Sequence, residues 1–332
     1  GIVTNDQAAD LVDTQNLRSQ GFSVGEVAGA CFCCSFDDLV STADRLAESA
    51  PDLLLAEPVG SCTDLVATVI LPLQQMLGER FELAPFGVLL KPSHGERILA
   101  EDGARSGFSP QAEYIFRKQL EEADYLMIGR ADVLEPNRID DLKAKLAVVA
   151  SDVPVLSVSP KTGLGVDEVI GYIESPMEAG RRLLQIDYDT YAEGEAELGW
   201  VNLSATLHAE TEIDMDAAAT RLVSEIATAI LADGEAAIAH VKASLSGDGV
   251  QAVANAVDNS GAVDVGLLAA RPASGMIEVV VNARVAMDPG ALETFCEASV
   301  RRLAEQSTMT VRGLSARSLR PGRPTPTHRV TA

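Results

Sequence analysis

The sequence has 332 residues, of which 47% are hydrophobic and only 4% aromatic, and its formal net charge at pH 7 is −23. Such a negative charge argues against nucleic acid or an anionic membrane as a partner. No apolar run approaches the roughly twenty residues of a membrane span, and no secretory signal is evident. We therefore expect a cytoplasmic protein, long enough for two domains with separate cores.

The first half of the chain alternates short apolar runs with helical patterns. The predicted strands are 2–4, 24–27, 52–56, 86–90, 125–128 and 155–158, and the predicted helices are 37–49, 63–76, 109–123, 138–150 and 166–173. Buried strands separated by helices are typical of a doubly wound, mostly parallel sheet. We therefore predict an α/β domain over residues 1–178.

The pattern changes in the second half. Residues 179–198 are acidic, and we expect them to form a linker. Residues 199–316 contain runs of adjacent strands between two helices, which favours a smaller α+β domain of ferredoxin-like kind. Residues 317–332 are rich in Pro and Arg without an apolar pattern, and we expect a disordered tail.

Three of the five cysteines, Cys31, Cys33 and Cys34, lie within four residues, between a predicted strand and a predicted helix. Thiolates bind zinc and other late transition metals well. Three thiols leave one position of a tetrahedral site open, so a fourth ligand must come from elsewhere in the chain, from water or from a second copy of the chain. The alternative is that the thiols are buried as small hydrophobic groups, which we expect for the isolated Cys62 and Cys296.

Polar residues follow the carboxyl ends of four predicted strands, where ligands bind in doubly wound sheets. They include Asp6, Glu57, Asp132 and the segment 159–162. Each is a weak signal because loops are polar in any case. Together, on one edge of a single sheet, they indicate a ligand site.

These residues resemble motifs of the CobW/HypB/UreG-like metallochaperone GTPases, in particular the CobW-like branch. Residues 1–6 are similar to that branch's second strand and the acidic residue after it. Residues 28–34 are similar to its Gly-Gly-x-Cys-x-Cys-Cys metal motif, with Ala30 at a position where another small residue is common. Residues 57–60 are similar to its Glu-x-x-Gly, in which Glu replaces the usual Walker B aspartate.

Two further segments resemble the family's base-reading motifs, and the resemblance covers about residues 1–175. Arg130-x-Asp132 is similar to Asn-Lys-x-Asp, and Ser159-Pro160-Lys161 is similar to Ser-Ala-Lys. The resemblance implies that Arg130, Asp132, Ser159 and Lys161 contact the nucleotide. Asp132 would accept hydrogen bonds from guanine N1–H and N2–H, which adenine cannot supply.

The resemblance also implies a P-loop NTPase fold and a function. Cys31, Cys33 and Cys34 would bind zinc or cobalt. Asp6 and Glu57 would hold Mg²⁺ and position the attacking water, while Gly60 would contact the γ-phosphate of GTP. Hydrolysis would then gate transfer of a metal or a cobalamin-related cofactor to a client metalloprotein or cofactor enzyme, and a homodimer could complete the metal site.

Two departures from the family pattern matter. No Gly-x-x-x-x-Gly-Lys-Ser/Thr phosphate loop occurs in the sequence. In the family this loop lies just upstream of the strand that opens the chain, so we expect the N-terminal domain to lack its first strand, P-loop and helix and not to hydrolyse GTP as it stands. Gly129 replaces the Asn of the base-reading motif, which weakens guanine selectivity.

These departures leave two alternatives open. One is a non-hydrolysing metal-binding or scaffold protein that retains the fold and the cysteine site. The other is thiol redox chemistry through Cys33 and Cys34, which ranks last because adjacent cysteines form strained disulfides.

Overall fold

The computed structural model describes residues 1–6, 11–100, 108–234 and 236–331. The chain divides into two compact units. The first unit comprises residues 1–31, 37–59 and 195–322, and the second comprises residues 32–36, 60–194 and 323–332. The units interleave along the sequence, whereas the domains predicted from the sequence follow one another.

A small parallel sheet opens the first unit. Its strands are β1 (Ile2–Asp6), β2 (Val24–Ala28) and β3 (Leu55–Glu57), in the order β2-β1-β3. The connecting helices are α1 (Val12–Ser19), which the sequence analysis missed, and α2 (Phe36–Ala47), which it predicted. The expectation of a buried third strand is wrong, because β3 pairs only with β1 at the sheet edge and its residues are exposed.

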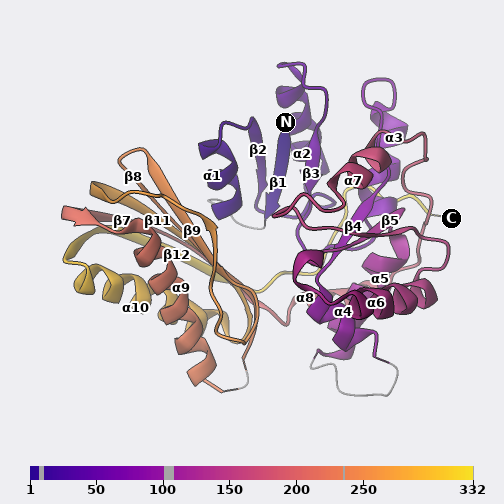
Figure 1. The fold of residues 1–332 in the computed structure, drawn as a ribbon. Coiled ribbons are helices and arrows are strands. Elements are labelled where there is room, and N and C mark those ends of the chain that lie inside the picture. The colour runs from indigo at the N-terminus through magenta and orange to yellow at the C-terminus, as the bar shows by residue number, and fades with distance from the viewer. Residues whose placement is uncertain (7–10, 101–107, 235, 332) are drawn as a thin grey trace. The chain divides into compact units, whose positions relative to one another are not determined.

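A six-stranded antiparallel sheet forms the rest of the first unit, in the order β10-β9-β8-β11-β7-β12. The strands are β7 (Gly199–Ile213), β8 (Ala237–Gly247), β9 (Val250–Ala256), β10 (Asp264–Leu267), β11 (Ala273–Ala286) and β12 (Met309–Leu319). Helices α9 (Met215–Ala232) and α10 (Pro289–Gln306) cover one face of this sheet (Figure 1). With α9 after β7 and α10 after β11, the order β8-β11-β7-β12 confirms the ferredoxin-like prediction.

Strand β9 pairs with β8 through a tight hairpin. Asp248 and Gly249 occupy the turn with φ of 49° and 71°. Two positive φ values in sequence are typical of a type I′ turn, for which Asp-Gly is a preferred pair. The dipeptide was therefore an available signal for β9.

The second unit contains a second parallel sheet, in the order β4-β5-β6. Its strands are β4 (Gly87–Leu90), β5 (Tyr125–Ile128) and β6 (Val155–Ser157). The helical segments are η1 (Val66–Ile70), α3 (Leu71–Leu77), α4 (Pro92–Ile98), α5 (Pro110–Glu122), η2 (Ala131–Val133), α6 (Pro136–Val149), α7 (Val166–Ile173) and α8 (Tyr188–Glu195). Leu126, Leu142 and Leu146 are fully buried between this sheet and α6. Parallel strands alternating with helices confirm the predicted α/β class.

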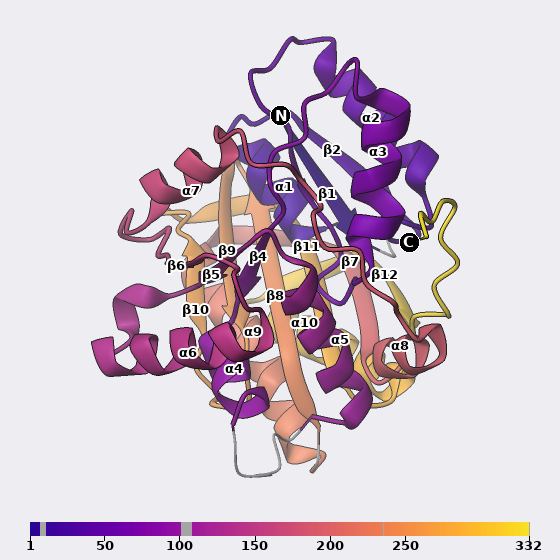
Figure 2. The ribbon, with the colours of Figure 1, turned by 90° about the vertical axis from the view of Figure 1, so that its right-hand side faces the viewer.

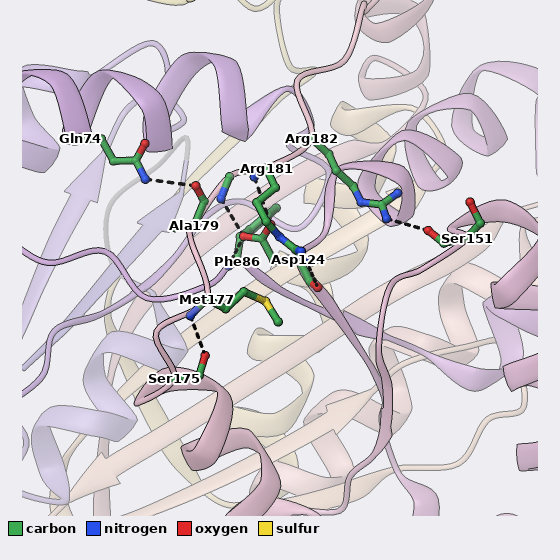
Figure 3. A network of polar contacts seen from close by, with 10 residues as sticks. Gln74, Phe86, Asp124, Ser151, Ser175, Met177, Ala179, Arg181 and Arg182 are labelled. Carbon is green, nitrogen blue, oxygen red and sulfur yellow. Dashed lines mark hydrogen bonds and ion pairs between the residues drawn. The ribbon is translucent and has the colours of Figure 1, made fainter.

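Asp124, at the start of β5, fastens the segment that follows α7 to this sheet (Figure 3). Its fully buried carboxylate accepts hydrogen bonds from the backbone N–H groups of Phe86 (2.8 Å) and Gly180 (2.7 Å) and pairs with Arg181 (3.3 Å). A buried carboxylate needs such partners. The first residues of the predicted linker are therefore held against β4 and β5.

The rest of the predicted linker contains α8. The Asp187 carboxylate accepts hydrogen bonds from the N–H groups of Asp189 (2.9 Å) and Thr190 (3.3 Å), which is how an aspartate caps a helix N-terminus. Tyr191 is 1% exposed, and its hydroxyl accepts a hydrogen bond from Thr63 N–H at 3.2 Å. This part of the acidic segment is therefore a capped helix, α8, with one buried aromatic side chain, and not the linker expected from its composition.

The C-terminal segment differs from the expected disordered tail. Residues 317–319 belong to β12. Beyond the strand, the segment passes α8 (Figure 2), with which it shares the Arg323–Asp189 ion pair. Further on, Val330 N–H donates a hydrogen bond to Ala67 C=O of η1 (2.9 Å). Across the described residues, no helix combines the length and apolarity needed to cross a bilayer.

Candidate functional site

The end of β1 holds the backbone that leads into the cysteine motif. The Asn5 side-chain amide donates hydrogen bonds to the carbonyl oxygens of Val27 (2.9 Å) and Ala30 (2.8 Å), and Gly29 N–H donates to the carbonyl oxygen of Asp6 (3.0 Å). Gly29 has φ of +99°, a conformation that favours glycine. The turn into the cysteines is therefore specified by Asn5 and Gly29 together.

The three cysteine sulfurs lie within 4.8 Å of one another, and they are the one group of three or more potential metal ligands found in the described part of the chain. Cys31 and Cys33 are buried, Cys34 is half-buried, and none of the three forms a disulfide. The Sγ atoms of Cys33 and Cys34 are 3.7 Å apart. Tetrahedral zinc with Zn–S bonds of about 2.3 Å requires sulfurs about 3.8 Å apart, so the donor set fits a single soft metal ion.

The first predicted carboxylate, Asp6, lies at the carboxyl end of β1 in an ion pair that the sequence analysis missed. Its Oδ2 accepts a hydrogen bond from Arg284 Nη2 at 2.6 Å, and Arg284 reaches it from β11. The guanidinium also donates to the carbonyl oxygen of Val201 (3.0 Å) and lies over the Trp200 ring (4.2 Å). Burial lowers the pKa of Arg284, and the negative charge of Asp6 opposes this effect.

Glu57, the second predicted carboxylate, ends the neighbouring strand, where it pairs with Thr4. The residue is exposed overall, but its pKa is raised because nearby protein atoms desolvate the carboxylate and Asp13 repels its charge, while Lys242 partly offsets both effects. Asp13 and Lys242 form an ion pair of 2.5 Å. Carboxylate oxygens are the ligands that Mg²⁺ prefers, but a role for Asp6 and Glu57 at this cation stays a prediction.

Gly60 is exposed, and a Cβ atom at this position would meet nothing within 4 Å. Its carbonyl oxygen accepts a hydrogen bond from the Gln119 side chain (2.9 Å). Local packing therefore does not require glycine here, and a contact between its N–H and a phosphate stays a prediction.

The predicted base-reading residues come from two loops at one end of the β4-β5-β6 sheet. Ala131 N–H donates to the carbonyl oxygen of Val158 at 3.1 Å, which joins the loop after β5 to the loop after β6. Arg130 and Asp132 flank this hydrogen bond on one loop, and Ser159 and Lys161 lie on the other. Arg130, Asp132 and Lys161 are exposed and Ser159 is buried, so the fold brings the four residues to one edge, while their roles stay predictions.

The sequence analysis also missed the contact between the C-terminal segment and the cysteine motif. Thr325 N–H donates to Cys34 Sγ with an N–S distance of 3.3 Å. The two residues are 291 positions apart, and the C-terminal segment has no apolar periodicity. No pattern in the sequence could have indicated this contact.

The chain is similar to a known family of domains and to solved structures. The family model described as "CobW/HypB/UreG, nucleotide-binding domain" matches residues 1–157. The Zn(II)-bound YjiA GTPase from E. coli is 13% identical, with 91% of this chain and 97% of that chain covered and a TM-score of 0.31. A Zn(II)-bound triple mutant of YjiA GTPase is also 13% identical, with 91% and 89% covered and a TM-score of 0.32. No curated protein sequence matches.

Proposed function

Because residues 1–157 belong to the CobW/HypB/UreG family of nucleotide-binding domains, we propose that the protein is a GTP-dependent metallochaperone. In this proposal Cys31, Cys33 and Cys34 bind zinc or cobalt as cargo, and the bound nucleotide controls its release to a client protein. The observation that supports the proposal most directly is the cluster of three cysteine sulfurs within 4.8 Å of one another, none of them in a disulfide.

An open coordination position suits delivery of the metal. Three protein ligands leave one tetrahedral position for water or for a donor atom of the client. A client thiol or imidazole could therefore displace the protein's ligands one at a time, without a free metal ion in solution. Zinc and cobalt both accept such a sulfur-rich donor set.

The backbone links the carboxylate end of β1 to the cysteines. In this proposal Asp6 keeps its Oδ2 on Arg284 and would offer Oδ1 to Mg²⁺, while its carbonyl oxygen accepts a hydrogen bond from Gly29 N–H and Asn5 holds Ala30. Mg²⁺, held there by Asp6 and Glu57, would neutralise phosphate charge. A rearrangement at Asp6 would be transmitted through Gly29 to the next turn, provided that nucleotide binding favours one of two conformations.

The metal part of the proposal is tested by titration of the reduced protein with Co²⁺ and Zn²⁺. We expect one equivalent of Co²⁺ to give thiolate charge-transfer absorption. Cys31→Ser, Cys33→Ser and Cys34→Ser should each weaken zinc binding at least tenfold, by loss of one ligand. Cys62→Ser is the matched control because Cys62 is also a buried cysteine outside a disulfide. Equal losses in all four variants would rule out a site at the cluster.

The nucleotide part is tested on the product of the complete natural reading frame. We expect GTP to bind in preference to ATP, and Asp132→Ala to reduce that preference at least tenfold. A second candidate function, a non-hydrolysing metal-binding scaffold, is favoured by the absence of a Gly-x-x-x-x-Gly-Lys-Ser/Thr motif from these 332 residues. Stoichiometric metal binding without GTP turnover would support that alternative.

A further inference from the structure

The C-terminal residues 323–331, which we name the strap, lie against Cys33 and Cys34 in the second unit. Thr327 makes two hydrogen bonds to it, from its N–H to Cys33 C=O (2.8 Å) and from its hydroxyl to Cys34 C=O (3.2 Å). Two residues earlier, Thr325 N–H donates to Cys34 Sγ (3.3 Å). The strap therefore contacts both the backbone and the most exposed sulfur of the motif.

Further along, the strap is anchored at three more points. The His328 ring packs edge-on against Phe36, with 4.9 Å between ring centroids. Arg329 Nε donates to Asp64 Oδ2 at 2.7 Å, and Val330 N–H donates to Ala67 C=O at 2.9 Å. His328 is not grouped with the three cysteines as a potential metal ligand, and the contact that the structure shows for its ring is the one with Phe36.

The anchor at Asp64 is chemically specific. The Asp64 side chain is 1% exposed, and its Oδ2 also accepts a hydrogen bond from the Tyr188 hydroxyl at 2.7 Å. A buried carboxylate is costly unless a cation or several donors compensate it. Arg329 supplies that positive charge from the strap, and its guanidinium also lies over the Tyr188 ring at 5.8 Å.

The same strap has features of a segment that can be released. The Arg329 side chain is 31% exposed, and Thr325 and Thr327 are exposed as whole residues. Each of its hydrogen bonds contributes little net, because the released strap exchanges it for a hydrogen bond to water. Pro324 and Pro326 restrict the free chain, which reduces the entropy lost on docking. Docking can thus be both specific and reversible.

We propose that the strap is a releasable cover of the cysteine motif, latched by the Arg329–Asp64 pair, and that it limits the access of metal ions and thiol reagents to Cys34. Its role in metal exchange rests on the function proposed above, but its effect on thiol access does not. An undocked strap exposes Cys34 to a client, whereas a docked strap slows loss of the cargo.

The test is alkylation of the reduced, metal-free, full-length protein by iodoacetamide, with the rate at each cysteine measured by peptide mass spectrometry. In the Arg329→Ala variant, iodoacetamide should alkylate Cys34 at least fivefold faster than in the parent. Arg312→Ala, an exposed arginine of β12, is the matched control and should leave the rate unchanged. The buried Cys62 and Cys296 report any global unfolding and should remain protected.

A second variant keeps the proposal testable if Arg329→Ala disturbs the region around Asp64. Thr327→Pro removes both hydrogen bonds from Thr327 to the cysteine motif and leaves the Arg329–Asp64 pair in place. It should also accelerate alkylation of Cys34. Parental rates in both variants, with Cys62 protected, would overturn the proposal.

Metal exchange gives an independent readout. Zinc-loaded Arg329→Ala should transfer zinc to a chromogenic chelator several times faster than Arg312→Ala, with a smaller change in equilibrium affinity. If the parent binds no zinc but Cys34 is alkylated faster in the strap variants, the strap proposal is supported and the metallochaperone proposal fails. If zinc binds and neither its exchange rate nor thiol access responds to the variants, the strap proposal fails alone.

Discussion

Two aspartate–arginine pairs of similar length differ in how firmly the arginine is held. Arg284 lies 2.6 Å from Asp6, and its side chain is 4% exposed. Arg329 lies 2.7 Å from Asp64, where the aspartate is 1% exposed but the arginine side chain is 31% exposed. In one pair a buried arginine contacts an aspartate whose side chain is 13% exposed, and in the other a partly exposed arginine contacts a buried aspartate.

The surroundings of each arginine explain what this difference means. Arg284 is on β11, which pairs with β7 and β8, and its guanidinium also bonds to Val201 C=O and covers Trp200. It cannot leave Asp6 without breaking other contacts. Arg329 is on the strap and can leave Asp64 without disturbing a sheet. The two ion pairs thus have similar lengths, but the Arg284–Asp6 pair is permanent and the Arg329–Asp64 pair can open. We call the first the permanent joint and the second the latch.

The largest expected effect comes from breaking the permanent joint. Arg284→Ala leaves Asp6 without its cation and removes the contact with Trp200, so we expect the free energy of unfolding to fall by about 3–5 kcal/mol. Urea denaturation followed by circular dichroism measures this loss. Arg312→Ala should change the free energy by no more than about 0.5 kcal/mol. A loss below about 1 kcal/mol for Arg284→Ala would contradict the comparison.

The free energy of unfolding should depend on pH because of Glu122, which lies near Asp64. Glu122 is 1% exposed and accepts hydrogen bonds from Thr63 Oγ1 (3.0 Å) and Val66 N–H (3.2 Å). Burial raises its pKa from 4.5 to about 8; the hydrogen bonds oppose this shift, and Asp64 adds to it. The folded state therefore holds the proton more tightly than the unfolded state. Protonated Glu122 therefore stabilises the folded state fully below pH 4.5, and this stabilisation is lost as the pH rises toward 8.

Glu122→Gln removes the titrating group. Between pH 5 and 8, we expect the stability of the parent relative to this variant to fall by up to about 1.4 kcal/mol per pH unit. Urea denaturation across that range measures the slope. Glu168→Gln, at an exposed glutamate of α7, should keep the parental pH dependence. Parallel profiles for the parent and Glu122→Gln would show that Glu122 does not titrate in this range.

The smallest effect is expected from opening the latch. Arg329→Ala should lower the free energy of unfolding by about 1–2 kcal/mol, between the values of an exposed and a buried pair. Arg329→Lys should recover much of this loss because one ammonium can reach Asp64. Arg284→Lys should recover little, since lysine cannot reproduce the fork of donors. Equal losses for the two alanine variants, in the same urea assay, would remove the distinction between joint and latch.

Local signals explain why many elements could be predicted from the sequence. Helix α5 follows Ser109, whose side chain caps Ala112 N–H (3.0 Å), and begins with Pro110. The exposure of β3 was not predictable from its apolar sequence, because it depends on how many neighbours the strand has. Helix α8 was missed because acidic residues outweighed its single buried tyrosine, Tyr191.

In the candidate site too, contacts between residues close in sequence could be predicted, and contacts between distant residues could not. Cys31, Cys33 and Cys34 are close in sequence, so their spacing alone indicated that the sulfurs could meet. Arg284 is 278 residues from Asp6, and Thr325 is 291 residues from Cys34. Such pairings are set by tertiary packing and leave no period in the sequence. The proximity of the three sulfurs could therefore be predicted, but the groups that hold and cover them could not.

The position of the strap in the chain has a consequence for biosynthesis. Translation proceeds from the N-terminus, and Thr325 is added 291 residues after Cys34. At about 5–20 residues per second, the thiols exist on the ribosome for roughly 15–60 s before their cover is made. A nascent chain could thus acquire its metal through an open site that the finished protein later closes.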